Sequence, residues 1–356
     1  MTTGITHRER VLRSIEYKQI DRIPFFFRAE TSITERLKKK YNLKEDLDII
    51  SYFDADAIHI GVPYKKEWIK EPDEKGIFYD MFGNKIKSVE YETISSEKVV
   101  EPILAGATAV DDIYKINWPD RSIIDLDESV RQAKYAYSTD LAVYGGVWAS
   151  IFTHSRSMMG EERYLVSMIS NPQLVSKLVE RITDCFIELN EAYLSACSKY
   201  IDIYYFGSDF GAQSSMFISR DMFCDFFKSN LKRLVDHAKG FGLKVMFHTC
   251  GAVSDIVPDL IECGVDILDP VQVSASNMAP DNLASKFKNK IAFHGGISTQ
   301  TTLPYEKPEV VREKVISTIE TLGPLGYIAA PDQDMLGDIP TENIEMMFET
   351  IKGYKL

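Results

Sequence analysis

The sequence of 356 residues predicts a parallel α/β fold, a (β/α)8 barrel (TIM barrel), and two observations carry that prediction. Eight short apolar runs rich in β-branched and aromatic residues recur along the chain, and helix-like stretches separate most of them. Strands buried on both faces need such runs, and eight strand–helix units favour closure into a barrel. A doubly wound open sheet is the alternative. The runs are residues 23–27, 57–60, 141–144, 201–206, 244–247, 265–268, 291–294 and 327–330.

Start and stop signals delimit four of the helices between these runs. Asn171 and Pro172 begin a long amphipathic stretch, and Ser219 is placed to cap the next helix. Gly264 and Gly323 follow the ends of two others. The predicted helices span residues 171–198, 219–240, 253–263 and 308–322.

Residues from about 63 to 110 interrupt the strand–helix alternation. The stretch from Gly76 to Lys85 is typical of a β-hairpin with a turn at Gly83 and Asn84. We therefore expect one domain over residues 1–356, with an insertion after the second strand that covers the barrel mouth or contacts another subunit.

Composition narrows the function classes. The formal net charge of −12 argues against nucleic acid or an anionic membrane as the main partner. No apolar run is long enough to span a bilayer, and the first ten residues lack an apolar signal core, so we expect a cytoplasmic protein. Five scattered cysteines predict reduced thiols. The motifs of serine hydrolases, P-loop NTPases and Rossmann dehydrogenases are absent.

The strongest candidate site is His248-Thr249-Cys250-Gly251, at the end of the fifth predicted strand. Side chains two apart on a strand point the same way, so His248 and Cys250 are expected to converge. Imidazole nitrogen and thiolate sulfur are preferred zinc donors, and Gly251 lets the backbone turn closely past an ion. A buried thiol beside a hydrogen-bonded histidine is the alternative interpretation.

Further polar residues follow other strands, where the chemistry of a barrel is located. Asp209 and Gln213 follow the fourth strand, separated by a glycine, and could orient a substrate or supply a metal donor. Five further residues are weak signals when taken singly, but together they form a ring around the rim of the predicted barrel. They are Arg28, His59, Trp148 (which packing explains better than chemistry), Gln272 and His294.

Several stretches together resemble the uroporphyrinogen decarboxylase superfamily, and in particular its corrinoid-dependent methyltransferase-like branch. They are RERVL at 8–12, DRIP at 21–24, DFGAQ at 209–213, GLKVMFHTCG at 242–251, GVDILDPVQ at 264–272, FHGGI at 293–297 and IPTENI at 339–344. The resemblance spans the chain, is most specific from about residue 200, and implies a (β/α)8 barrel.

The resemblance offers two chemistries. True uroporphyrinogen decarboxylases use no metal, grip substrate carboxylates with an arginine-rich segment after the first strand, and carry a histidine after the last. Here Ala29 and Glu30 follow Arg28, so the second arginine is absent, and Gln333 stands where the histidine is expected. These departures argue against decarboxylation of uroporphyrinogen.

The methyltransferase branch binds zinc through an H-x-C pair on the fifth strand and a cysteine after the last strand. His248 and Cys250 match the pair, but no cysteine follows Cys263. In that branch the corrinoid usually sits on a separate small protein, and this chain shows no corrinoid-binding motif of its own. Three carboxylates are available as oxygen donors in place of the missing cysteine: Asp209, Asp332 and Asp334.

Three functions are therefore open. The first is a cytoplasmic methyltransferase that moves a methyl group between a small substrate and a corrinoid (cobalamin) protein with the help of zinc. The second is a metal-free carboxy-lyase with Arg28 as carboxylate anchor, and the third is a non-catalytic barrel that binds small molecules.

The sequence does not identify the methylated substrate: aromatic methyl ethers, methylamines, betaines and methylated thiols all remain open. The resemblance is compatible with a homodimer. The expected residues are Asp209, His248 and Cys250 for catalysis, the last two for metal binding, and Arg28, Trp148, Gln213, Gln272, His294 and Gln333 for substrate binding.

Overall fold

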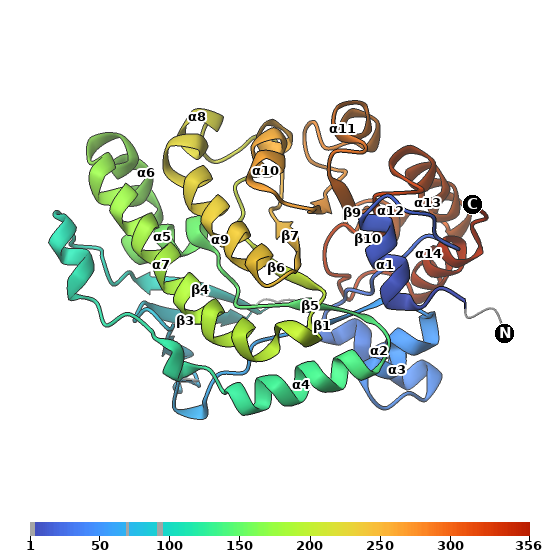
Figure 1. Cartoon of the computed structure of the whole chain (residues 1–356), viewed down its shortest axis with the longest axis horizontal. Coiled ribbons are helices and arrows are strands. Elements are labelled where there is room, and N and C mark those ends of the chain that lie inside the picture. Colours follow the sequence, from blue (N-terminus) through green and yellow to red (C-terminus); the bar gives the residue numbers. More distant parts are fainter. Residues whose placement is uncertain (1–3, 69–70, 91–94) are drawn as a thin grey trace.

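A curled parallel sheet forms the centre of the molecule (Figure 1). The computed structural model describes residues 4–68, 71–90 and 95–356, and in these residues seven strands follow the order β1-β5-β6-β7-β8-β9-β10. Each strand pairs with its neighbours in parallel, as predicted. The strands are β1 (Ala57–Ile60), β5 (Ala142–Gly145), β6 (Ile203–Gly207), β7 (Lys244–His248), β8 (Ile267–Val271), β9 (Ala292–Ile297) and β10 (Tyr327–Pro331).

Residues 23–27 do not form the regular first strand that the sequence predicts. Phe25 makes an isolated parallel bridge to Ala329 of β10, and the Phe26 N–H donates to the Ala329 carbonyl over 3.0 Å. On the other side, the Phe25 carbonyl accepts from the N–H of Asp56, just before β1 (2.9 Å). Pro24 has no N–H to extend the ladder, so the pairing stays short. The segment nevertheless occupies the eighth position and links the first and last strands of the barrel.

Side chains that point into the barrel form two levels, because successive residues of a strand alternate between its faces. The lower level is small or aliphatic and is sealed by Val11 and Ile15 of α1 (His7–Ile15). It contains Ala57, Ala142, Ile203, Met246, Ile267 and Ala292. Two residues further along each of these six strands, the upper level is aromatic or polar: His59, Tyr144, Tyr205, His248, Asp269 and His294. The seventh strand, β10, instead contributes the apolar Ile328 and Ala330. The sequence therefore places its chemically active side chains at the carboxyl ends of the strands.

Helices cover the outside of the sheet, and their apolar faces form the main core with it. The predicted helices 171–198 and 308–322 are α7 (Pro172–Cys197) and α13 (Pro308–Leu322). Asn171 and Ser219 cap their helices by accepting from the N–H groups of Leu174 and Met222. The predicted helix 219–240 contains a π-helical turn at Cys224–Lys228, between α8 (Arg220–Phe223) and α9 (Ser229–Gly240). The predicted helix 253–263 starts with a 3-10 turn at Ser254–Ile256 before α10 (Val257–Cys263).

Eight further α-helices of the described residues, named at the end of this paragraph, lie around the same sheet (Figure 1). Within the described parts of the chain, none of the helices combines the length and apolar character needed to cross a membrane. The remaining helices are α2 (Thr31–Tyr41), α3 (Asp46–Phe53), α4 (Leu126–Ser138), α5 (Ile151–Met159), α6 (Glu161–Ser170), α11 (Pro280–Phe287), α12 (Thr302–Tyr305) and α14 (Thr341–Gly353).

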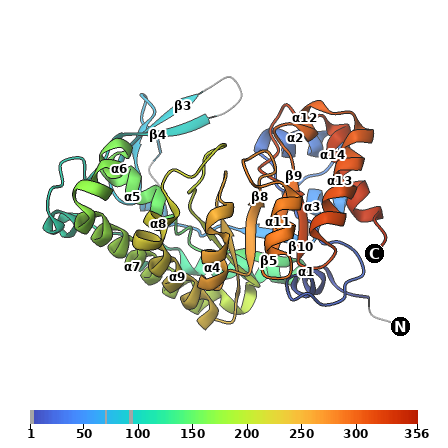
Figure 2. The same ribbon diagram turned by 90° about the horizontal axis from the view of Figure 1, so that it is seen from above.

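The insertion carries an antiparallel sheet of its own, formed by β2 (Ile77–Tyr79), β3 (Lys85–Glu90) and β4 (Ser95–Glu101). The predicted hairpin is present, but Tyr79 pairs with Lys85, so five residues rather than two connect its strands. The Asp80 carboxylate accepts from two N–H groups of this loop and holds it. Residues 69–70 and 91–94 of the predicted insertion lie outside the described residues. Figure 2 shows β3 and β4 along the upper edge of the molecule, to the left of α2, α12 and α14.

Candidate active site

Three possible metal donors converge where β6 and β7 end. His248 is the last residue of β7, Cys250 follows it by two positions, and Asp209 comes from the loop after β6. The Nε2 atom of His248 lies 3.2 Å from the Cys250 Sγ and 3.6 Å from the Asp209 Oδ1, and all three donor atoms lie within 4.8 Å of one another. A tetrahedral zinc ion would separate such nitrogen–sulfur and nitrogen–oxygen pairs by about 3.6 and about 3.3 Å. The donor set therefore fits zinc.

Glycines allow the two loops that carry these donors to touch through their backbones. A Cβ on Gly211 would lie 2.6 Å from the Cys250 carbonyl oxygen, and a Cβ on Gly251 would lie 2.4 Å from the carbonyl carbon of Gly211. Gly251 also has a φ of +83°, which side chains rarely tolerate. In addition, the Asp209 Oδ1 accepts a hydrogen bond of 3.0 Å from the Cys250 N–H. This close contact holds Asp209 beside the His248–Cys250 pair.

Asp269, on β8, lies beneath this cluster and is fully buried. It accepts from the Nδ1 of His248 over 2.6 Å and from the Nδ1 of His294 over 2.5 Å. The Tyr205 hydroxyl and the Arg28 Nη1 also donate to it, over 2.9 and 3.0 Å. A carboxylate on Nδ1 turns Nε2 of the imidazole toward the metal position. Asp269 was missed among the sequence candidates, although its place two residues after Ile267 on an inward face was a usable signal.

Charges in this network shift several pKa values. Burial opposes ionisation of Asp269, but Arg28, His294 and His248 hold its pKa well below the usual range. For His248, burial opposes protonation, but Asp269 and Cys250 outweigh burial and raise its pKa to about 10. Burial lowers the pKa of His294 despite Asp269. Metal binding requires the Nε2 proton of His248 to leave, whereas Asp269 retains the proton on Nδ1.

A cavity of about 660 Å3 lies against this cluster. Its wall includes His248, the hydrogen-bonded Arg28 and a set of aromatic rings. Trp148, in the loop after β5, lines the cavity and has 40% of its surface exposed. Desolvation by the surrounding cavity wall and the charge of Arg28 lower the pKa of His59, which faces the same cavity, to about 4. The aromatic members of the wall are Phe27, His59, Tyr144, Trp148 and Tyr205.

The other expected residues divide into two groups. Gln333 belongs to the site, because it lines the cavity and its Nε2 donates to the Cys250 Sγ over 3.0 Å. Gln272 and Gln213 hold loops instead. The Oε1 of Gln272 accepts from the Gly251 N–H over 2.7 Å, and the Nε2 of Gln213 donates to the Ser274 carbonyl.

Of the three carboxylates considered as oxygen donors, two bind other partners. Asp332 accepts from the N–H and hydroxyl of Thr299, over 2.8 and 2.9 Å, and Asp334 accepts from the Arg28 Nε over 3.2 Å. Among the described residues, Asp209 is therefore the carboxylate that joins His248 and Cys250.

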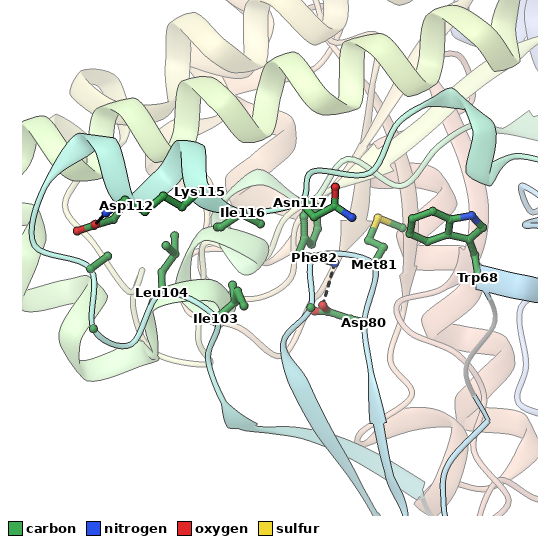
Figure 3. A pocket seen from close by; sticks show the side chains of 13 residues that line it. Trp68, Asp80, Met81, Phe82, Ile103, Leu104, Asp112, Lys115, Ile116 and Asn117 are labelled. Carbon is green, nitrogen blue, oxygen red and sulfur yellow. Dashed lines mark hydrogen bonds and ion pairs between the residues drawn. The ribbon is translucent and has the colours of Figure 1, made fainter.

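A second cavity, of about 470 Å3, lies between the hairpin turn and the segment from Ile103 to Asn117 (Figure 3). Trp68 and Met81 lie at one end of it and Lys115 at the other. It shares no lining residue with the cavity at the barrel mouth. Its carboxylates, Asp80 and Asp112, are hydrogen-bonded to nearby backbone N–H groups, so the cavity offers no comparable site.

A family model for uroporphyrinogen decarboxylase (URO-D) matches residues 71–354. The chain belongs to the URO-D family. The barrel is also similar to the solved structure of a methyltransferase from Methanosarcina mazei, with a TM-score of 0.70 and 16% identity over 98% of this chain and 99% of that one. This similarity shows a shared fold over the full URO-D barrel.

A B12-independent methionine synthase from Shewanella sp. W3-18-1 is more distant, with a TM-score of 0.49 and 13% identity over 93% of this chain and 94% of that one. That similarity is too low to support an argument. None of the curated proteins matches the chain. The URO-D match confirms the resemblance from residue 71 onward, while the stretches at 8–12 and 21–24 lie outside it.

Proposed function

We propose that this URO-D family protein is a zinc-dependent methyltransferase that moves a methyl group between a small methylated substrate and a corrinoid protein. The observation that carries the proposal is the convergence of His248, Cys250 and Asp209 beside the mouth cavity. One nitrogen, one sulfur and one oxygen donor from the protein leave a fourth tetrahedral position open, as catalytic zinc sites do.

The chain's own side chains would divide the work of this site. When bound, zinc supplies a Lewis acid that polarises the heteroatom carrying the methyl group. Asp269 keeps the proton on Nδ1 of His248, so that Nε2 faces the donor cluster. Gln333 donates a hydrogen bond to the Cys250 Sγ and disperses part of the thiolate charge. The aromatic wall holds the substrate beside the cluster and limits water there.

The corrinoid would be carried by a separate small protein that docks at the barrel mouth. This part of the proposal follows from the function, because methyl transfer to cobalt needs a corrinoid and the sequence shows no corrinoid-binding motif. The cavity lies at the carboxyl ends of the strands, where a docked partner would reach it.

A metal-free decarboxylase is supported less well. It would need Arg28 to anchor a substrate carboxylate, but this guanidinium already donates to Asp269 and Asp334. A substrate carboxylate would have to compete with both. A non-catalytic binding barrel would need no donor cluster at all, so the shared approach of three donors favours catalysis over binding alone.

Metal analysis combined with two variants tests the proposal. We expect about one zinc per chain in protein purified without added metal. His248→Ala and Cys250→Ser should lose zinc and methyl transfer to a corrinoid protein. Cys224→Ser is the matched control, because Cys224 contacts Asp259 outside the cluster, and it should retain both. The proposal would be overturned if the purified protein contained no zinc and the His248→Ala variant still transferred methyl groups.

A further inference from the structure

The wall of the mouth cavity is a set of mutually packed aromatic rings. The ring centroids of Trp148 and Tyr205 are 5.2 Å apart, and those of Tyr205 and Tyr144 are 5.5 Å apart, both in edge-to-face geometry. The ring of His59 packs against Tyr144, with centroids 5.0 Å apart. Neighbouring rings that hold one another in this way form a stiff surface, and a flat aromatic ligand gains most from such a surface.

Charged groups of the cavity wall are already paired. In the described residues that line the cavity, Arg28 binds Asp269 and Asp334, and Asp46 binds Lys38 over 2.8 Å. No lining carboxylate is therefore left unpaired for a methylated ammonium ion, and no lining arginine is left for an anion. Burying an unpaired charge is costly, and a cation in this cavity would have only the aromatic faces to replace its lost water while Arg28 lines the same wall, so the cavity favours a neutral ligand.

The geometry also places a substituent of such a ligand at the donor cluster. The ring of Trp148 lies 5.7 Å from the ring of His248, centroid to centroid. A ligand ring against Trp148 would therefore carry a short substituent directly beside the His248–Cys250 pair. The cavity of about 660 Å3 has room for it, because a benzene molecule fits in roughly 150 Å3.

We infer that the methyl donor is a neutral aryl methyl ether, an inference that rests on the proposed function. The aromatic wall binds the ring, and the ether oxygen lies at the donor cluster. In the reaction the bond between oxygen and methyl carbon breaks, and the oxygen keeps the electron pair. The methyl carbon bonds to the Co(I) of a reduced corrinoid, whose cobalt supplies two electrons and becomes Co(III). The phenolate takes up a proton, and its ring stabilises the negative charge on the leaving oxygen.

Ligand-observed NMR can measure binding to the zinc-loaded protein, which tests the ligand class without any turnover. The probes are methoxybenzene, its saturated analogue methoxycyclohexane, and tetramethylammonium. Methoxybenzene should bind about fivefold more tightly than methoxycyclohexane, since aromatic pairing contributes beyond the buried area. Trp148→Leu should weaken methoxybenzene binding about tenfold, and Trp148→Phe should restore most of it.

Trp68→Leu is the matched control, because Trp68 is similarly exposed (37%, against 40% for Trp148) but lines the second cavity (Figure 3). It should bind all three probes as the unmodified protein does. Equal binding of the two ethers, tighter binding of tetramethylammonium, or an unchanged affinity in Trp148→Leu would overturn the inference.

Methyl transfer to a Co(I) corrinoid protein separates the two proposals. Transfer from methoxybenzene supports both. Transfer from tetramethylammonium or dimethyl sulfide, with none from methoxybenzene, overturns the inference and leaves the proposed function standing. Selective methoxybenzene binding without transfer from any donor supports the ligand class and overturns the proposed function.

Discussion

At the scale of single residues, Asp269 is the side chain on which the candidate site depends. Its two oxygens bind four side chains from different parts of the chain: Arg28, Tyr205, His248 and His294. A carboxylate that is fully buried stays ionised only when such partners compensate for the lost water. The orientation of the proposed zinc ligand His248 is therefore tied to a charge that lies outside the metal cluster.

Asp269→Asn removes that charge and should weaken zinc binding without removing a ligand. We expect a loss of about 10- to 100-fold in zinc affinity, measured by chelator competition. Arg28 would also lose its buried partner, so the free energy of unfolding should fall by roughly 3 kcal/mol in urea titrations. Asp334→Asn is the control, because Asp334 binds the same arginine from an exposed position and should change each quantity little. Unchanged zinc affinity in Asp269→Asn would contradict the positioning role.

Asp332 should give the protein a distinctive pH dependence. Burial raises the pKa of Asp332 to about 6, although Thr299 hydrogen-bonds to its carboxylate. The protonated form therefore stabilises the fold fully below pH 3.8, the ordinary value, and this contribution is lost as the pH rises through about 6. The variant Asp332→Asn does not titrate. Its stability relative to the unmodified protein should rise by about 2.5 kcal/mol from pH 4 to pH 8. Urea unfolding at both pH values measures this, and an equal difference at both would contradict it.

At the scale of elements, the sequence predicted those features that depend on interactions between residues close together in the chain. The caps at Asn171 and Ser219 mark the starts of helices correctly, and alternation along β7 predicted the convergence of His248 and Cys250. By contrast, β4 was not predicted, because its sequence, SSEKVVE, is too polar for a buried strand. The role of Asp269 was also missed, since its partners lie up to 241 residues away and no local pattern encodes them.

The contact between the loops after β6 and β7 gives a prediction at this scale. In Gly251→Ala, a new Cβ would lie 2.4 Å from the backbone of Gly211 at a φ of +83°. The loops must separate, which moves Asp209 away from His248 and Cys250, so zinc affinity should fall at least tenfold while far-UV circular dichroism stays the same. Gly240→Ala is the control, because nothing lies within 4 Å of its Cβ position. Zinc titration measures both, and equal affinities would contradict the prediction.

At the scale of the whole molecule, the N-terminal segment joins the two ends of the sheet. The buried Asp56 carboxylate binds Arg10 of α1 over 2.7 Å, Arg22 over 2.6 Å and the Phe25 N–H over 2.9 Å. From α1, the Ser14 hydroxyl donates to the Tyr327 carbonyl of β10 over 3.0 Å. Contacts between the first 60 residues and the last strand cannot form until both have been placed. We therefore expect that neither half of the barrel folds alone.

One cooperative unfolding transition should follow from this closure, as expected of a single domain over residues 1–356. The two halves carry independent probes: the three tryptophans all lie between Trp68 and Trp148, and the buried thiol of Cys263 lies in the second half. Two signals can be followed in a urea titration: tryptophan fluorescence, and chemical labelling of the Cys263 thiol as detected by mass spectrometry. Both should therefore change with the same midpoint. Asp56→Ala should shift both midpoints together to lower urea, because it breaks the link between α1, residues 23–27 and β1. Separate midpoints, or a shift of the fluorescence transition alone, would show that the halves unfold independently and that the N-terminal segment does not hold the barrel closed.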